Sequence, residues 1–375
     1  MTKILVFFDN YSHYHLARVN ALRDHVKSKN WEVMGMEITR DGIDYQWQNQ
    51  LTDNDVPIIS LLGNHKLDEV RFSDIAKQLF NKLRQFRPDV LVVAGYHRQI
   101  MILATLVFRA SGFPVVLMSE SKEDDSSRKW LVEKAKKLWL KSYQSAHVGG
   151  KLHRDYLIKL GMKPEGIFTG YDVVDNQTFH PDVIKKLPAP FTFPYFLTVN
   201  RFLPKKNLFN LIHAYHQYHQ QSNNPWHLIL CGDGELKVQI IQLITDLELK
   251  DYIHLTGFLQ QQELLPYFGH AQCFIHASKQ EQWGLVVNEA MGASLPVIVS
   301  RCCGCFNDLV REGVNGFGFD PENIKELSDL MMKISAPHCN LKAMGEASLQ
   351  HIQNYSPLTF AEGLTNAITF AQNSK

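Results

Sequence analysis

The stretch QCFIHASKQEQWGLVVNEAMGASLPVIVS (residues 272–300) alternates between two kinds of segment. Its two ends, 272–278 and 296–300, are short apolar runs of the kind that form buried strands. Residues 285–293 between them are good helix formers, and Gly284 stands where that helix would begin. The order strand, helix, strand predicts a βαβ unit with parallel strands.

The same alternation runs through the rest of the chain. Candidate strands lie at 3–9, 31–38, 88–95, 114–120 and 146–150, and then at 194–200, 226–232 and 252–257. These runs are apolar without interruption, which is typical of strands covered by helices on both faces. Helical patterns separate them, such as 73–86, where Ile75, Leu79 and Leu83 recur every four residues. The sequence therefore predicts an α/β protein with doubly wound parallel sheets.

A break in the pattern divides the chain into two parts. Four prolines cluster between residues 171 and 195 without a periodic apolar face, which indicates a linker. At 375 residues the chain is also long enough for two cores. We therefore expect two Rossmann-like domains, 1–175 and 190–355. Ligands of open α/β sheets bind beyond the carboxyl ends of the strands, so two facing sheets would form a cleft between the domains.

Composition excludes several classes of protein. With 39 Lys and Arg against 38 Asp and Glu, the net charge is only +1, which does not favour nucleic-acid binding. The cysteines of RCCGC (301–305) lack a second ligand pair at a zinc spacing, so we expect reduced thiols and no metal site. The apolar run at the start is too short for a secretory signal, and we expect a cytoplasmic protein.

The segment 127–143 is a strongly basic stretch that contains two tryptophans. As a helix it could lie on the inner face of an anionic membrane, which would suit a lipid-linked acceptor. The commoner arrangement packs the apolar side, here Leu131, Ala135 and Leu138, onto the sheet and leaves the charges solvated. We favour this second arrangement, and both remain open.

Several strand ends of the second half carry chemistry suited to an anionic ligand. Arg201 and Lys206 follow one strand on a turn that enters a helix, where a pyrophosphate would be well bound, although a solvated basic turn fits equally well. GDGE (232–235) follows the next strand and is by itself a plain glycine turn. Glu281 precedes the helix that starts near Gly284, and Glu289 lies inside it. Two carboxylates there can bind hydroxyl groups while the free amides of the helix meet phosphate.

Residues 194–320 resemble the retaining glycosyltransferases of the glycogen-synthase-like superfamily (group 1 type), which have the GT-B fold of two facing Rossmann-like domains. The resemblance rests on RFLPKKN (201–207), CGDGE (231–235), the two glutamates separated by seven residues with EAMGASLPVIVS (289–300), and GVNGFGF (313–319). It implies a hexosyltransferase-like enzyme that moves a sugar from a nucleotide-diphosphate donor, UDP- or GDP-linked, with retention and without a metal or other cofactor. It also implies that a helix at about 357–372 crosses back to the first domain.

The resemblance assigns roles to individual residues of the second domain. Arg201 and Lys206 would bind the diphosphate, and Glu281 would contact the transferred sugar. Glu289 would hold the ribose. The remaining donor contacts would come from backbone and base-binding positions, namely Gly284, Leu285, Gly257 and Phe258.

The first domain departs from the family pattern. The loop after the first strand, FFDNYSHYH (7–15), has no glycine, and its Asn10 and His13 could contact an acceptor or only solvate the next helix. Glu120 or Ser121 stands where many relatives have a histidine. His97 and Arg98 of GYHR (95–98) could compensate, or His97 could face solvent. The expected acceptor is a glycan or a lipid-linked sugar. A non-catalytic sugar-nucleotide-binding subunit on the same fold is the alternative, and another GT-B enzyme such as a phosphorylase is a third possibility.

Overall fold

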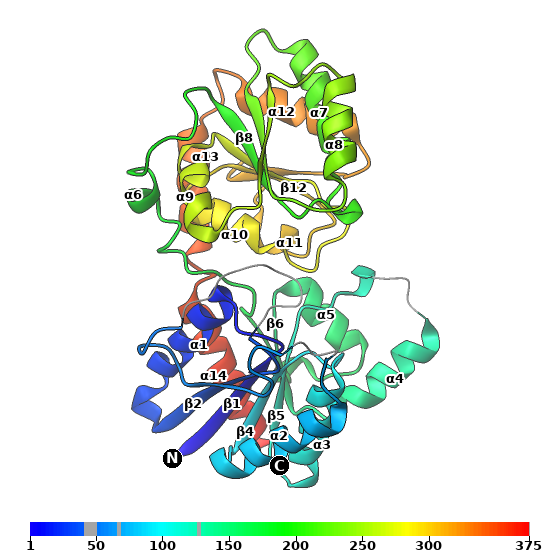
Figure 1. Ribbon diagram of the computed structural model, residues 1–375, viewed down its shortest axis with the longest axis vertical. Coiled ribbons are helices and arrows are strands. Elements are labelled where there is room, and N and C mark those ends of the chain that lie inside the picture. The colour runs from blue at the N-terminus through cyan, green and yellow to red at the C-terminus, as the bar shows by residue number, and fades with distance from the viewer. Residues whose placement is uncertain (41–50, 66–68, 126–128, 375) are drawn as a thin grey trace. The chain divides into compact units, whose positions relative to one another are not determined.

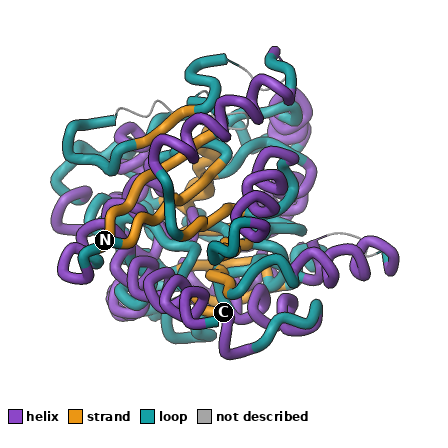
Figure 2. Tube along the Cα trace, turned by 90° about the horizontal axis from the view of Figure 1, so that it is seen from below, coloured by secondary structure: helices purple, strands orange, loops and turns teal. Residues whose placement is uncertain are grey.

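A computed structural model describes residues 1–40, 51–65, 69–125 and 129–374 of the chain. The chain divides into two compact units. Unit 1 contains Met1–Asp175 together with Tyr355–Lys375, and unit 2 contains Asn176–Asn354. Each unit is built on its own parallel sheet, whose strands run between helices (Figure 2).

The sheet of unit 1 has seven strands in the order β3-β2-β1-β4-β5-β6-β7, and all its neighbours pair in parallel. The strands are β1 (Thr2–Phe8), β2 (Trp31–Glu37), β3 (Ile58–Ser60), β4 (Val90–Ala94), β5 (Val115–Ser119), β6 (Ser145–Val148) and β7 (Ile167–Thr169). The order reverses direction at β1, which identifies a doubly wound sheet. The α/β class with doubly wound parallel sheets is thus confirmed for this unit.

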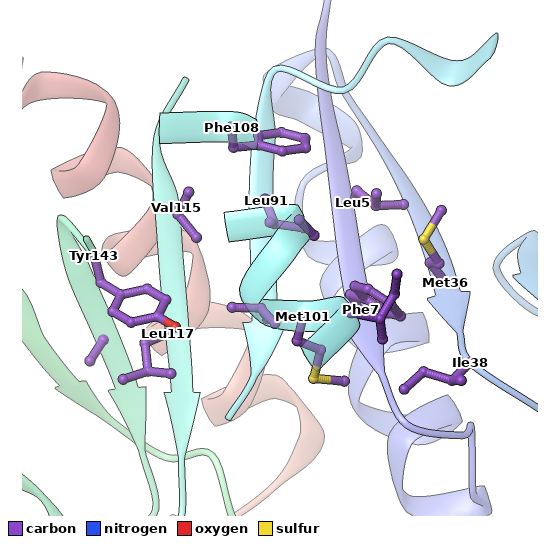
Figure 3. Packing of buried hydrophobic residues seen from close by; sticks show 14 of the residues in the cluster. Leu5, Phe7, Met36, Ile38, Leu91, Met101, Phe108, Val115, Leu117 and Tyr143 are labelled. Carbon is purple, nitrogen blue, oxygen red and sulfur yellow. The ribbon is translucent and has the colours of Figure 1, made fainter. Parts of the chain in front are cut away.

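Helices cover both faces of this sheet because its strands are apolar on both sides. Side chains alternate along β1, so that Leu5 and Phe7 enter one apolar layer while Ile4, Val6 and Phe8 enter the other. Figure 3 shows the first layer, in which Phe7 and Leu91 lie near Met101. The helices of the unit are α1 (His13–His25), α2 (Phe72–Phe86), α3 (Gln99–Ala110), α4 (Trp130–Leu140), α5 (Lys151–Lys159) and α14 (Pro357–Asn373), with short 3₁₀ turns η1 (Lys27–Lys29), η3 (Glu123–Asp125) and η4 (Pro164–Gly166).

The last helix of the chain, α14, belongs to unit 1. It lies beside α1 and against β6 and β7 (Figure 1). Its buried residues Phe360, Leu364 and Ile368 join the layer formed by one face of β1. The chain therefore leaves unit 1 after Asp175 and returns to it at Tyr355.

The orientation of α4 differs from the arrangement that we favoured. Leu131 and Leu138 are 62% and 69% exposed, so they do not pack onto the sheet. The inner side of the helix carries the buried Leu140 and a polar contact, in which Lys136 Nζ lies 3.1 Å from the Tyr156 hydroxyl of α5. The expected packing of Leu131, Ala135 and Leu138 is wrong because these inner contacts turn the apolar stripe outward.

Unit 2 has a six-stranded parallel sheet in the order β10-β9-β8-β11-β12-β13. Its strands are β8 (Tyr195–Val199), β9 (His227–Cys231), β10 (Ile253–Gly257), β11 (Cys273–His276), β12 (Val297–Ser300) and β13 (Gly316–Phe319). Its helices are α6 (Pro181–Ile184), η5 (Pro204–Lys206), α7 (Leu208–Gln221), α8 (Lys237–Asp246), α9 (Gln261–His270), α10 (Leu285–Gly292), α11 (Phe306–Leu309), α12 (Ile324–Ser335) and α13 (Leu341–Ile352). The order turns back at β8, so this sheet is doubly wound as well, as expected.

None of the helices within the described ranges is both long enough and apolar enough to cross a bilayer.

Candidate functional site

The carboxyl ends of the central strands of unit 2 gather the charged residues that we selected from the sequence. Arg201 and Lys206 follow β8, and Glu281 follows the neighbouring strand β11. Because parallel strands end at the same edge of a sheet, the two loops meet beyond that edge, where a backbone hydrogen bond joins Lys279 to Lys205. This edge is where ligands of doubly wound sheets bind.

Lys206 and Glu281 form an ion pair at the centre of this edge. Their side chains are only 14% and 15% exposed. Burial alone would raise the pKa of Glu281, but the hydrogen bond from His276 and the charge of Lys206 outweigh it and hold that pKa well below its ordinary value. Glu281 is therefore an anion at neutral pH.

His276 contacts the carboxylate of Glu281, and the sequence did not identify it as a site residue. It is the last residue of β11 and is fully buried. Its Nε2 lies 3.4 Å from Glu281 Oε2 and 3.3 Å from the hydroxyl of Ser278. It lies in an apolar strand, and the fold of the loop that follows this strand brings Glu281 to its ring.

The environment of His276 fixes its protonation. Burial lowers its pKa more than the hydrogen bond to Glu281 raises it, so the ring is neutral at neutral pH. Its Nδ1 is buried and makes no hydrogen bond within the described part of the chain. A proton on Nδ1 would be a buried donor without an acceptor, so the proton belongs on Nε2, from which it can be donated to Glu281 or Ser278.

Helix α10 begins directly beside this cluster. Gly284 caps it with φ 108° and ψ 61°, a left-handed conformation that glycine adopts without strain. A Cβ at Gly284 would lie 3.4 Å from His276 Nε2, so the helix start packs on the histidine ring. The Val287 amide donates a 2.9 Å hydrogen bond to the carbonyl oxygen of Gly284. The amides that precede it have no carbonyl partner within the helix, and the helix dipole favours an anion at this end. Glu289 lies one turn further along and is buried.

The glycines of GDGE have a packing role. A Cβ at Gly232 would lie 1.8 Å from the carbonyl oxygen of Asn200, and one at Gly234 would lie 2.7 Å from that of Phe202. The loop after β9 therefore lies directly against the loop that carries Arg201. The side chain of Arg201 is exposed. Gly257 ends β10, which lies beyond β9 in the sheet, and the next residue, Phe258, is 38% exposed.

The acceptor candidates lie in unit 1, on loops that follow β1, β4 and β5. Asp9 Oδ2 accepts a 2.7 Å hydrogen bond from Arg98 Nε and lies 3.4 Å from His97 Nε2. Burial alone would raise the pKa of Asp9, but these two partners lower it. His97 and Arg98 thus both contact the loop after β1 through Asp9, contacts that the sequence did not reveal.

The remaining candidates of unit 1 lie on the same loops or just after them. Asn10 follows Asp9, and its carbonyl oxygen lies 2.9 Å from Nδ1 of His15. His13 begins α1, and burial followed by the charge of Arg18 lowers its pKa to about 4. Glu120 follows β5, and its charge acts on Asp172. The burial of Asp172 is the main cause that raises the pKa of this residue well above its ordinary value, and the charge of Glu120 is the second.

No three His, Cys, Asp or Glu side chains lie in a metal-binding arrangement within the ranges that the structure describes. The six cysteines are free, and Cys303 and Cys305 of the RCCGC segment are buried. Burial, followed by the neighbouring Cys303, raises the pKa of the Cys305 thiol well above its ordinary value, so it stays protonated.

Comparison with known proteins relates both the sequence and the fold to glycosyltransferases. The family model described as "Glycosyl transferases group 1" matches residues 180–350. Alpha-monoglucosyldiacylglycerol synthase of Acholeplasma laidlawii is 33% identical over 33% of this chain and 31% of its own length. The amylovoran biosynthesis glycosyltransferase AmsK of Erwinia amylovora is 26% identical over 56% of this chain and 53% of its own. The chain thus spans about a third and about half of the length of these relatives.

The fold is shared over the whole chain. The crystal structure of Anabaena HepE in complex with UDP and glucose matches with a TM-score of 0.76 at 15% identity, covering 98% of this chain and 100% of that one. This likeness shows the fold, which is the expected GT-B fold with one Rossmann-like sheet in each unit. Residues 180–350, almost the whole of unit 2, are accordingly a domain of the glycosyl transferases group 1 family.

Proposed function

We propose that the chain is a glycosyltransferase that moves a sugar from a nucleotide-diphosphate sugar to a glycan or lipid-linked acceptor. The observation that carries this proposal is the largely buried Lys206–Glu281 pair beside the start of α10. A lysine, an exposed arginine at Arg201 and the N-terminal end of a helix together suit a diphosphate. The carboxylate of Glu281 suits the hydroxyl groups of the sugar attached to it.

The arrangement would act mainly on the transition state. As the bond between the anomeric carbon and the diphosphate breaks, negative charge gathers on the leaving oxygen. Positive groups that are already fixed in place, Lys206 above all, stabilise that charge more than they stabilise the bound donor, and this lowers the barrier. The same fixed charges support the proposal that the transfer needs no metal ion, and the resemblance to retaining enzymes supports retention at the anomeric carbon.

The relatives suggest where to begin with substrates. HepE was crystallised with UDP and glucose, so we propose UDP-sugars as the first donors to test and GDP-sugars as the next. The relatives named above are an alpha-monoglucosyldiacylglycerol synthase and an amylovoran biosynthesis glycosyltransferase, and these names support lipid-linked and glycan acceptors as the first to test. Within unit 1, the loop residues Asn10, His13, His97 and Glu120 are our proposed acceptor contacts.

The test is the variant Glu281→Gln, which keeps the shape of the side chain and removes its charge. Turnover of nucleotide-sugar donor, measured as nucleoside diphosphate release in the presence of EDTA, should fall by about a hundredfold or more if Glu281 acts in the transition state. Glu322→Gln is the matched control, because Glu322 forms an exposed ion pair with Lys279 in the adjoining loops. Donor binding retained by both variants, with no turnover by the wild type, would favour a non-catalytic sugar-nucleotide-binding subunit instead.

A further inference from the structure

Helix α4 of unit 1 exposes a large apolar surface. Its outer face consists of Trp130, Leu131, Val132, Ala135 and Leu138. The four larger side chains are 65%, 62%, 47% and 69% exposed, in that order, and Ala135 is exposed as well. Leu131, Ala135 and Leu138 are spaced four and three residues apart, so they form one continuous stripe along the helix. In Figure 1, α4 lies at the edge of unit 1.

The fold does not need this outer face, because α4 is held by its opposite side. Leu140 is buried, and Trp139 Nε1 donates a 3.0 Å hydrogen bond to the Tyr143 hydroxyl. Glu133 accepts from the Tyr156 hydroxyl at 2.8 Å and from Lys136 at 3.1 Å. Exposing four large apolar side chains is unfavourable in water unless another apolar surface covers them.

Lysines lie around the apolar stripe. Lys129, Lys134, Lys137 and Lys141 are all exposed, and none of them forms an ion pair with a residue of the described ranges. The Lys134 ammonium lies 4.6 Å from the centre of the Trp130 ring. The nearby acids are already engaged, since Glu133 binds Lys136 and Glu123 binds Lys159. The outer face of α4 is thus apolar along its middle and positively charged at its border.

We propose that the outer face of α4 docks on the surface of an anionic lipid bilayer. Leucine and tryptophan side chains would enter the boundary between headgroups and acyl chains, while the lysines extend to the anionic headgroups. A second copy of the chain fits less well, because a symmetric pairing of two such faces would bring the lysines of both copies together. The proposal rests on α4 alone and is independent of the chemistry at Glu281.

Flotation with vesicles tests the proposal on the full-length chain. The vesicles contain either phosphatidylcholine alone or phosphatidylcholine mixed with phosphatidylglycerol, and neither lipid carries a sugar. We expect the wild type to float with the anionic vesicles only, and less so at high salt because its lysines contribute electrostatically. The double variant Leu131→Ser/Leu138→Ser should lower the partition coefficient at least about tenfold, since two leucines would no longer be buried in lipid.

Matched controls separate this surface from general effects of mutation. Leu106→Ser changes a leucine of α3 that is 48% exposed in the same unit, and its partition should equal that of the wild type. The triple variant Lys134→Gln/Lys137→Gln/Lys141→Gln should lose the preference for anionic lipid. The control triple variant removes three exposed lysines of unit 2, namely Lys185→Gln/Lys186→Gln/Lys250→Gln. This control should keep the preference for anionic lipid.

Three results would overturn the proposal. The wild type could stay unbound to anionic vesicles. It could bind while the Leu131→Ser/Leu138→Ser variant, with an unchanged melting temperature, binds equally well. Lastly, sedimentation could show a dimer that this variant abolishes without any vesicle binding, in which case a second copy covers α4. None of these results would bear on the proposed glycosyl transfer.

Discussion

His276 positions the carboxylate of Glu281, and its role can be measured separately from the stability of the fold. In His276→Leu, Glu281 loses its neutral donor, so its carboxylate is held by Lys206 and Ser278 alone. Because a hydrogen bond to a charged group contributes roughly 1.5–3 kcal/mol, kcat should fall by about tenfold or more while KM for the donor changes little.

The variant His276→Gln is the conservative counterpart, because its amide can place a donor near the position of Nε2. Turnover by His276→Gln should lie well above that of His276→Leu. Equal loss in both variants, or a loss confined to KM, would mean that the histidine acts only through packing.

Gly232 has a packing role that can be measured as a contribution to stability. Its φ is 138°, and a Cβ there would meet the carbonyl oxygen of Asn200 at 1.8 Å. Gly313 has a φ of 73° but only one atom near its added Cβ, at 4.0 Å. Chemical denaturation should therefore show that Gly232→Ala costs at least about 2 kcal/mol more than Gly313→Ala, because the first adds a backbone clash to the strain. Similar costs for the two variants would refute the packing role of the GDGE turn.

At the scale of single elements, helix α4 gives a direct test of which side faces the core. Leu140 is 4% exposed and Leu138 is 69% exposed, two residues apart on the same helix. Leu140→Ala should lower the free energy of unfolding by about 2–4 kcal/mol, whereas Leu138→Ala should change it by less than about 0.5 kcal/mol. Urea denaturation of both variants measures the difference. A larger loss for Leu138→Ala would place the apolar stripe against the sheet after all.

The elements also show where sequence analysis succeeds. The long apolar runs predicted β1, β2, β4, β5 and β6 and the sheet class, since a strand buried on both faces needs a continuous apolar segment. Three strands were not predicted: β3 and β7 have only three residues each, too few for a pattern, and β13 alternates glycine with phenylalanine. The face of α4 was mispredicted because a polar contact to Tyr156, invisible in the sequence, decides its orientation.

The site could be predicted in part, because some of its residues directly follow strands that the sequence predicts. Arg201, Lys206 and Glu281 follow strands directly, and the rule that parallel strands end at one edge of the sheet predicts that they lie close together. Their roles in donor binding stay predictions. His276 and Arg98 were missed as partners of Glu281 and Asp9 because their contacts depend on how loops fold back over strand ends.

For the whole molecule, three histidines of unit 1, the buried His147 and the partly buried His13 and His15, make the stability depend on pH. Burial is the main cause that lowers the pKa of His15 and His147 to about 3 and that of His13 to about 4. In the unfolded chain the pKa of each is about 6.5. Between these values only the unfolded state binds the protons, so their contribution to stability is present above pH 6.5 and is lost as the pH falls.

When the pH falls from 7 to 5, each of these histidines should lower the free energy of unfolding by about 2 kcal/mol. Asp172 has the opposite effect on the free energy of unfolding, because its pKa is raised in the folded state. The variant His147→Asn should therefore lose about 2 kcal/mol less than the wild type over this pH range, whatever its stability at pH 7. Urea denaturation at the two pH values gives the difference, and an unchanged pH dependence would show that His147 does not titrate as described.

The most direct test of the central claim is thermal unfolding in EDTA with UDP, GDP, ADP or TDP, applied to the wild type, Lys206→Gln and Lys279→Gln. Lys279 is the control because its ion pair with Glu322 lies in the adjoining loops and is exposed. One nucleotide should stabilise the wild type and Lys279→Gln by about 2.7 kcal/mol at 100 times its dissociation constant, and Lys206→Gln much less. Stabilisation by none of the four, or equal stabilisation of all three proteins, would contradict a diphosphate site at Lys206 and Glu281.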